Sequence, residues 1–196
     1  MHQTEYLLVG VQAGQTRKVT IGGRLVPTAI HKASVMGAVP VGPLGLMGDE
    51  QADLTVHGGL DKALYAYPTE HYPFWAEARR QAGAAGLDET LAWGAMGENL
   101  SLQGLLEADL WLGDMLQFEH CTLRVTQPRE PCFKFNAAMG FSQAVRRMAQ
   151  TGYCGFYLSV DEPGHVRAGE SFSVLAGPRR IRVPDSFQAK MFKHLR

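Results

Sequence analysis

Turn-forming residues are so frequent in this chain that they limit the length of every regular element. The 196 residues include 22 glycines and 10 prolines, which separate short stretches of apolar and β-branched residues. Glycine supplies the backbone freedom that turns need, and proline interrupts the hydrogen bonding of helices and inner strands. The pattern therefore predicts a mainly β fold of barrel type, with irregular loops and a few peripheral helices.

The expected elements are short and lie along the whole chain. Alternating or continuous apolar patterns predict strands over residues 5–12, 24–31, 100–102, 115–118, 122–126, 155–160 and 170–175. Helical spacing predicts helices over residues 69–81, 141–150 and 184–194, the first with an irregular first turn because it contains Pro73. Since no repeat or linker divides it, the chain is expected to form one barrel domain over residues 1–178 and a short helical tail over 179–196.

The charged residues of the chain balance. Lys plus Arg total 19 and Asp plus Glu total 19, which gives a formal net charge of +0 at pH 7. Such a chain has no overall field that would attract a nucleic-acid polymer or an acidic membrane surface, so neither is expected as a partner. A bound anion would have to be held by a local cluster of cations and backbone amides.

The cysteines and the N-terminal segment indicate the compartment. Three cysteines, an odd number without Cys-x-x-Cys spacing, fit neither a disulfide framework nor a thiol–disulfide motif, which favours a reducing compartment. The N-terminal segment lacks a basic run that leads into an apolar one, and no stretch approaches the ~18 apolar residues of a membrane span. We therefore expect a cytoplasmic location. Cys121 and Cys154 lie in apolar, strand-like surroundings and are expected to be core residues.

Cys132 differs from the other two cysteines in its surroundings. A predicted strand ends shortly before it, and Pro128 and Pro131 stiffen the connection. Arg129 and Lys134 are close in the sequence, and nearby positive charge favours the thiolate, the form that attacks electrophiles or binds metals. From the residues alone, Cys132 is either a reactive or metal-binding thiol or an inert buried one.

Two further segments carry groups that suit ligand binding. The adjacent Gly58 and Gly59 could turn several backbone amides toward one anion, and Lys62 could add a charge. An ordinary glycine turn with a solvated lysine remains an alternative, as does a structural role for His57, because no second histidine lies at zinc-ligand spacing from it. Asn99 could pair with an amide-edged heterocycle such as a pterin, but it is also a common turn residue.

Motifs for common redox cofactors are missing from the sequence. The spacing of Gly42, Gly45 and Gly48 lacks the close glycine pair of a dinucleotide fingerprint. There is no Walker motif, no cysteine-rich iron–sulfur pattern and no histidine pair at metal-ligand spacing. If the protein carries out redox chemistry, its electrons must come from a partner.

Several motifs follow one another in the order found in the MOSC-domain family, in its YiiM-like branch, and the chain resembles that family from about Ala29 to Leu175. The motifs are Ala29-Ile30-His31-Lys32, Pro43-Leu44-Gly45-Leu46-x-Gly48-Asp49-Glu50-Gln51-Ala52-Asp53, His57-Gly58-Gly59-x-Asp61-Lys62-Ala63, Tyr67-Pro68-x-Glu70-His71-Tyr72, Gly97-Glu98-Asn99-Leu100, Gly113-Asp114 and Gln127-Pro128-Arg129-x-Pro131-Cys132-x-Lys134. Each motif is weak alone, but together they are specific.

The resemblance implies a MOSC-type β-barrel that binds the molybdenum cofactor, in which one cysteine thiolate holds the metal. By position that metal ligand is Cys132, and the dithiolene of the molybdopterin would supply two further sulfurs. Lys32 matches a basic position that would meet the phosphate of the cofactor. The full set of cofactor-binding residues that the resemblance implies is Lys32, His57, Gly58, Gly59, Asp61, Lys62, Asn99, Arg129 and Cys132.

The activity that the resemblance implies is a reduction. YiiM-like proteins are implied to reduce N-hydroxylated compounds, such as hydroxylamino-purines, to amines with electrons from a separate reductase, which would detoxify N-hydroxylated bases. We expect Cys132, Asp61 and His57 to be catalytic, with Asp61, His57 or Glu98 as the proton source. The alternative is a carrier of the molybdenum cofactor or of sulfur, with Cys132 as ligand or persulfide; a binding module with a structural thiol is a third reading. The oligomeric state stays open.

Overall fold

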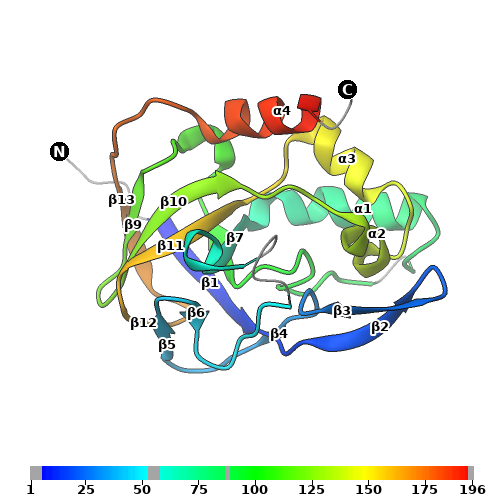
Figure 1. Cartoon of the computed structure of the whole chain (residues 1–196), viewed down its shortest axis with the longest axis horizontal. Helices are drawn as coiled ribbons and strands as arrows, with labels where there is room; N and C mark the ends of the chain where they lie inside the picture. The colour runs from blue at the N-terminus through cyan, green and yellow to red at the C-terminus, as the bar shows by residue number, and fades with distance from the viewer. Residues whose placement is uncertain (1–5, 53–57, 87–88, 194–196) are drawn as a thin grey trace.

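The computed structural model describes residues 6–52, 58–86 and 89–193. Its centre is a closed barrel (Figure 1), in which seven strands follow one another in the order β1, β13, β9, β10, β11, β7 and β8, and β8 returns to β1. The barrel strands are β1 (Tyr6–Ala13), β7 (Leu64–Pro68), β8 (Leu100–Gln103), β9 (Met115–Gln117), β10 (Thr122–Pro128), β11 (Phe156–Glu162) and β13 (Ser171–Leu175). The prediction of a mainly β, barrel-type fold is confirmed.

Smaller elements surround the barrel. β4 (Ala33–Ser34) extends the sheet beside β1, and β2 (Arg17–Ile21) and β3 (Arg24–Thr28) form a separate hairpin that reaches away from the barrel in Figure 1. A three-stranded sheet contains β5 (Val39–Gly42), β6 (Gly45–Leu46) and β12 (Gly164–Val166). The helices are α1 (Tyr72–Gln81), α2 (Phe133–Met139), α3 (Ala144–Thr151) and α4 (Val183–Lys193), with short 3₁₀ turns η1 (Leu60–Lys62), η2 (Thr69–His71) and η3 (Glu107–Asp109).

The pairing of β7 with β8 is parallel, whereas the other barrel pairs are antiparallel. Two parallel neighbours cannot be joined by a tight hairpin, so the chain must leave the barrel between them. It does so through α1, which lies on the outside of the barrel together with α2, α3 and α4 (Figure 1). This crossover creates the space between barrel and helices in which a second core forms.

Apolar side chains form two separate clusters, one inside the barrel and one under the helices. β7 contributes to both, because successive side chains of a strand point to opposite faces. Leu64 and Ala66 belong to the cluster inside the barrel, and Tyr65 and Tyr67 belong to the outer cluster with Trp75. The outer cluster is rich in aromatic rings that meet edge to face, a geometry that favours the attraction of ring edges to ring faces.

Each of the seven predicted strands and three predicted helices has a counterpart in the structure. The strand predicted over residues 24–31 ends earlier, at Thr28, and the first helix begins at Tyr72 after the η2 turn, as its proline indicated. Residue 5 and residue 194, the outer ends of two predictions, lie outside the described residues. Within the described ranges no helix is long and apolar enough to cross a membrane.

Candidate functional site

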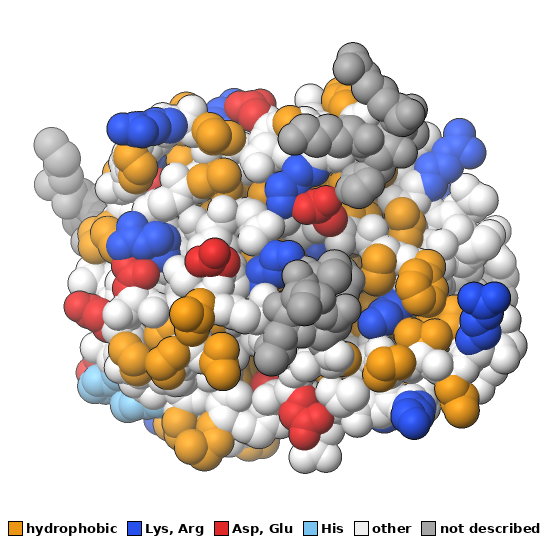
Figure 2. All heavy atoms as spheres, in the orientation of Figure 1, with side chains coloured by type: hydrophobic (Ala, Val, Ile, Leu, Met, Phe, Trp, Pro, Cys, Tyr) orange, Lys and Arg blue, Asp and Glu red, His pale blue; other side chains and the backbone are white. Residues whose placement is uncertain are grey.

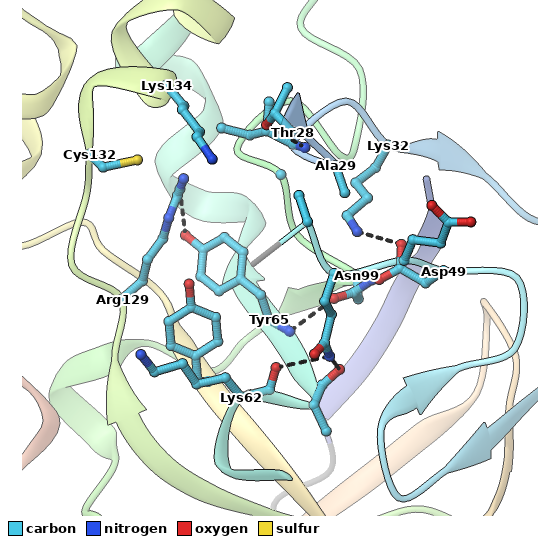
Figure 3. Close-up of a pocket in the computed structure, with 17 residues that line it drawn as sticks. Thr28, Ala29, Lys32, Asp49, Lys62, Tyr65, Asn99, Arg129, Cys132 and Lys134 are labelled. Carbon is cyan, nitrogen blue, oxygen red and sulfur yellow. Dashed lines mark hydrogen bonds and ion pairs between the residues drawn. The ribbon is translucent and has the colours of Figure 1, made fainter. Parts of the chain in front are cut away.

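An open cavity lies where the end of β10, the base of the β2–β3 hairpin and the segment after β6 meet. Figure 3 shows the Cys132 sulfur on one side of it and the Lys32–Asp49 pair on the other. Four cations and two carboxylates are among the residues that line it, together with two tyrosines: Lys32, Lys62, Arg129, Lys134, Asp49, Glu50, Tyr65 and Tyr157. The cations outnumber the acids here, although Figure 2 shows acidic, basic and apolar side chains interspersed over this face of the molecule.

Cys132 enters the cavity wall at the end of a stiff connection. It is the residue before α2, its backbone is extended (φ −125°, ψ 174°), and its carbonyl oxygen accepts a hydrogen bond from the amide of Phe135 at 2.8 Å. These contacts fix the Cys132 backbone, and its side chain is partly exposed and lines the cavity. Of the three cysteines it is therefore the one that a ligand in the cavity can reach.

The other two cysteines are core residues, as their apolar surroundings predicted. Both are buried. Burial raises the pKa of the Cys121 thiol to about 12, with smaller contributions from Glu170 and Glu162. Burial also raises the pKa of Cys154 well above its ordinary value. In the part of the chain that the structure describes, no three His, Cys, Asp or Glu residues gather as a metal site built from side chains alone would require.

Arg129 is a buried cation beside Cys132. Its side chain lies over the rings of Tyr65 and Phe135, at 4.8 Å and 4.9 Å from their centroids, and its residue is 6% exposed. The guanidinium donates to the carbonyl oxygen of Met96 at 2.7 Å. It takes part in none of the ion pairs found among residues 6–52, 58–86 and 89–193. A buried cation without a carboxylate partner favours an anion in the adjoining space, because burial of an uncompensated charge is costly.

On the opposite side of the cavity, Lys32, Asp49 and Asn99 form one hydrogen-bonded unit. The Lys32 ammonium and the Asp49 carboxylate are an ion pair, and each side chain is 6% exposed. The Asn99 amide donates to the second Asp49 oxygen at 2.8 Å and accepts from the backbone amide of Tyr65 at 3.1 Å. Burial lowers the pKa of Lys32, and the neighbouring Asp49 carboxylate opposes that shift.

Gly58 and Gly59 do not form the open anion-binding turn that their sequence suggested. Gly59 has the positive φ that adjacent glycines permit (89°), but its amide donates to the side-chain oxygen of Gln51 at 2.8 Å. A Cβ on Gly58 would meet the same oxygen at 2.3 Å. Lys62 reaches the cavity, with its ammonium 5.6 Å from the Tyr157 ring centroid, and His57 lies outside the described residues. The two glycines thus pack against Gln51, which lines the cavity.

Asp61 and Glu98 do not appear in the wall of this cavity. Asp61 lines a second recess with Arg124, Thr126 and Lys190. Glu98 is fully buried, and its carboxylate accepts from the amides of Gly94 and Met96 at 2.7 Å and 3.1 Å, and from the hydroxyls of Ser101 and Tyr72. The placement supports a structural role for Glu98 more than proton delivery.

Five residues predicted to bind a cofactor line one cavity: Lys32, Lys62, Asn99, Arg129 and Cys132. Sequence reasoning missed the two tyrosines, Tyr65 and Tyr157, and assigned no role in the site to Asp49. The signal for Asp49 was its place in the motif Gly48-Asp49-Glu50, close before the glycine segment. The tyrosines could be found only through the pairing of β7 with β11.

Comparison with known proteins agrees with this geometry. The family model described as "MOSC domain" matches residues 53–173, which is more than half of the chain. The chain belongs to the MOSC domain family. MOSC domains are associated with molybdenum cofactor binding.

Curated relatives of this MOSC protein include both short and long chains. YflK of Bacillus subtilis is 37% identical over 93% of this chain and 80% of its own length, and YiiM of Escherichia coli is 39% identical over 82% of this chain and 69% of its own length. A protein of Gibberella moniliformis named "Reductase" is 32% identical over 88% of this chain, which spans 30% of that relative. Among solved structures, YiiM of Geobacillus stearothermophilus is similar with a TM-score of 0.74 and 29% identity, over 96% of this chain and 85% of that one.

Proposed function

We propose that this MOSC protein is an oxidoreductase that uses the molybdenum cofactor, with Cys132 as the protein ligand of the metal, to reduce N-hydroxylated compounds to amines. The observation that carries the proposal is the position of Cys132: of the three cysteines it alone is partly exposed, and it lines a cavity in which cations outnumber carboxylates. Family membership and the fungal relative named "Reductase" support the reaction class.

The residues of the cavity fit the chemistry of the cofactor. A molybdopterin offers two sulfurs to its metal, so the protein needs to add one soft ligand, and a thiolate suits that task. The anionic end of the cofactor needs cations, which Lys62, Arg129 and Lys134 provide at the cavity. On the far side Lys32, which the family motif assigns to the phosphate, has ammonium N–H groups left for the phosphate or the heterocycle. The N–H groups of Asn99 already donate to Asp49 and Gln12. When bound, the cofactor would supply the two-electron redox centre that the chain's own residues lack.

The chain's residues would bind, orient and shield the reactants. Arg129 keeps its charge at any physiological pH and is held by Met96, so it offers a fixed positive field beside the thiol. Tyr65 and Tyr157 are buried aromatic residues that restrict the cavity on the barrel side. A cavity that is fixed in this way orients a ligand with little reorganisation, which is the main advantage of a preformed site.

The proposed reaction balances with two electrons and two protons. The N–O bond of R–NH–OH breaks, the nitrogen gains a proton and becomes R–NH₂, and the oxygen leaves as water. We propose that a separate reductase supplies the electrons, because the sequence carries no flavin, dinucleotide or iron–sulfur motif. Of the two carboxylates at the cavity, Asp49 already accepts from three donors, so Glu50 joins His57 and Asp61 as a candidate for passing protons.

Metal analysis tests the proposal directly. The chain is produced in a molybdenum-replete host and its molybdenum is measured by mass spectrometry, together with Cys132→Ser and the matched control Cys121→Ser. We expect roughly one molybdenum per chain in the wild type and the control, and a loss of most of it in Cys132→Ser. Absence of molybdenum from the wild-type protein under replete conditions would overturn the proposal.

Activity separates an enzyme from a carrier. With the cofactor bound and a chemical electron donor present, the protein alone should convert a hydroxylamino-purine to the amino-purine. Bound molybdenum without any conversion would favour the carrier, and a persulfide on Cys132, detected as added mass under non-reducing conditions, would favour sulfur transfer.

A further inference from the structure

Asp49 receives hydrogen bonds from three separate parts of the chain. Its carboxylate accepts from the ammonium of Lys32, from the side-chain amide of Asn99 at 2.8 Å and from the backbone amide of Gly14 at 2.7 Å. These donors come from the segments before β4, before β8 and after β1. One carboxylate therefore ties together three strand ends at the wall of the cavity, and Figure 3 shows its contact with Lys32.

The charge of Lys32 depends on this carboxylate. A lysine side chain that is 6% exposed loses most of its hydration, which disfavours the ammonium form. Burial is the largest influence on the Lys32 pKa and lowers it; Asp49 raises it most strongly, and the more distant Glu98 raises it further. Removal of the Asp49 charge would leave burial with little opposition, so a larger share of Lys32 would be neutral at a given pH.

The orientation of the Lys32 and Asn99 side chains depends on the Asp49 carboxylate as well. The ammonium has three N–H donors, and a contact to Asp49 uses one of them, which leaves two for other acceptors. The Asn99 NH₂ group donates to Asp49 and to the carbonyl oxygen of Gln12 at 3.2 Å, and its oxygen accepts from the Tyr65 amide, so its orientation is fixed. Asp49 thus sets both the charge and the direction of the Lys32 ammonium, the donor on this side that keeps N–H groups for a ligand.

The neighbouring acid, Glu50, provides a contrast. It also lines the cavity, but it is exposed, and its carboxylate accepts from the backbone amide of Thr16 at 2.8 Å rather than from another side chain that lines the cavity. The two acids are adjacent in the chain and carry the same charge. Substitution of Glu50 is therefore a matched control for substitution of Asp49.

We propose that Asp49 is a positioning residue of the cavity, which keeps Lys32 protonated, directs its ammonium toward the bound ligand and fixes the orientation of Asn99 in the wall. The identity of that ligand as the molybdenum cofactor rests on the proposed function above. The dependence of Lys32 on Asp49 does not rest on it, since the contacts are present in the chain itself.

The first experiment needs no cofactor. Lysines of the folded protein are labelled with trace acetic anhydride over a range of pH, and mass spectrometry gives the titration of each lysine in the wild type, Asp49→Asn and Glu50→Gln. We expect Asp49→Asn to raise the neutral fraction of Lys32 about tenfold at a given pH, and Glu50→Gln to leave it unchanged. The same Lys32 titration in all three proteins would overturn the proposal.

A conservative variant separates positioning from general stability. Asp49→Glu keeps the negative charge, so it should leave the titration of Lys32 close to that of the wild type. If Asp49 had only a structural role, Asp49→Asn and Asp49→Glu would change the Lys32 titration equally. If Asp49→Asn does not fold, the labelling of Asp49→Glu decides the matter together with Asn99→Ala, which keeps the Lys32–Asp49 pair. A Lys32 titration that shifts more in Asn99→Ala than in Asp49→Glu contradicts the assignment.

The second experiment uses the cofactor-loaded protein. The rate of molybdopterin release is measured for Asp49→Asn, Lys32→Met and the double variant. If Asp49 acts through Lys32, each single variant should release the cofactor about tenfold faster than the wild type, and the double variant should be no faster than Lys32→Met. Additive effects would refute the coupling. A wild-type chain that never binds molybdenum would refute the proposed function and leave the labelling result intact.

Discussion

Arg129 donates a hydrogen bond of 2.7 Å from its guanidinium to the carbonyl oxygen of Met96, and this bond joins the segment that carries Cys132 to the loop before β8. The amide of the same Met96 donates to the carboxylate of Glu98 at 3.1 Å. One peptide segment is thus held from both sides, by a buried acid and by a buried cation. The position of the cation beside Cys132 therefore depends on Glu98, although Glu98 does not line the cavity.

Substitution of Glu98 should destabilise the fold strongly. In Glu98→Gln one carboxylate oxygen becomes an NH₂ group, which would oppose the hydroxyl and amide donors of Tyr72, Ser101 and Gly94. We expect a loss of about 2–4 kcal/mol in the free energy of unfolding, because buried donors would lose a charged partner. Urea denaturation measures this loss. The control Glu77→Gln, an exposed acid of α1, should change it by less than about 0.5 kcal/mol, and equal effects would contradict the assigned role of Glu98.

The reactivity of the three cysteines should differ sharply. A maleimide added at neutral pH should modify Cys132 much faster than Cys121 or Cys154, because both of those thiols are buried and burial raises their pKa. Mass spectrometry of peptides after brief labelling gives the three rates. In denaturant the rates should become similar. Fast labelling of Cys121 in the folded protein would show that the barrel is open at that point.

The sequence predicted the barrel better than the small elements around it: six of the seven barrel strands were expected, whereas β2, β4, β5, β6 and β12 were not. The barrel strand that was missed is β7 (Leu64–Pro68), because all five of its residues are buried and show no polar alternation. α2 (Phe133–Met139) was missed for a different reason. It spans seven residues, too few to show a helical period, and it begins directly after the proline-rich segment.

The site was predictable where its residues lie in motifs and not where the fold brings them together. Arg129 and Cys132 are three residues apart, and their charge and chemistry could be read together. Asp49, Tyr65 and Tyr157 come from distant segments, and their meeting depends on strand pairing. Proton sources were inferred from residue type alone, and residue type does not distinguish a fully buried carboxylate such as Glu98 from a carboxylate that lines the cavity.

Two glycines with nearly equal backbone angles should respond differently to alanine. Gly97 has a φ of +84° and Gly48 a φ of +85°, so alanine is strained by about 1–2 kcal/mol at either position. A Cβ on Gly97 would also meet the Ile30 side chain at 2.8 Å, whereas a Cβ on Gly48 would have no heavy atom within 4 Å in the described part of the chain. We expect Gly97→Ala to cost roughly 1–3 kcal/mol more than Gly48→Ala.

Thermal unfolding of the two glycine variants checks this difference. Gly97 and Ile30 both line the cavity, so the cofactor content of Gly97→Ala should fall as well, while that of Gly48→Ala should stay near the wild-type value. Equal melting temperatures for the two variants would contradict the prediction, because they would show that the Ile30 side chain moves to accommodate a methyl group on residue 97 at no cost in stability.

His31, next to Lys32 in the chain, should make stability depend on pH below neutrality. Burial lowers the pKa of His31 from its ordinary value of 6.5, and the charge of Arg17 lowers it further. The unfolded chain therefore binds a proton at His31 at a higher pH than the folded chain does, so stability is lost as the pH falls through 6.5 toward the lower, folded pKa. In His31→Gln that loss is removed, and the melting temperature should fall less between about pH 7 and pH 5 than in the wild type. The loss of melting temperature due to His31 should be small, because the residue is exposed. Arg17→Gln should also reduce this loss, since it removes one cause of the lowered His31 pKa. Parallel melting curves for all three proteins across this pH range would contradict the prediction.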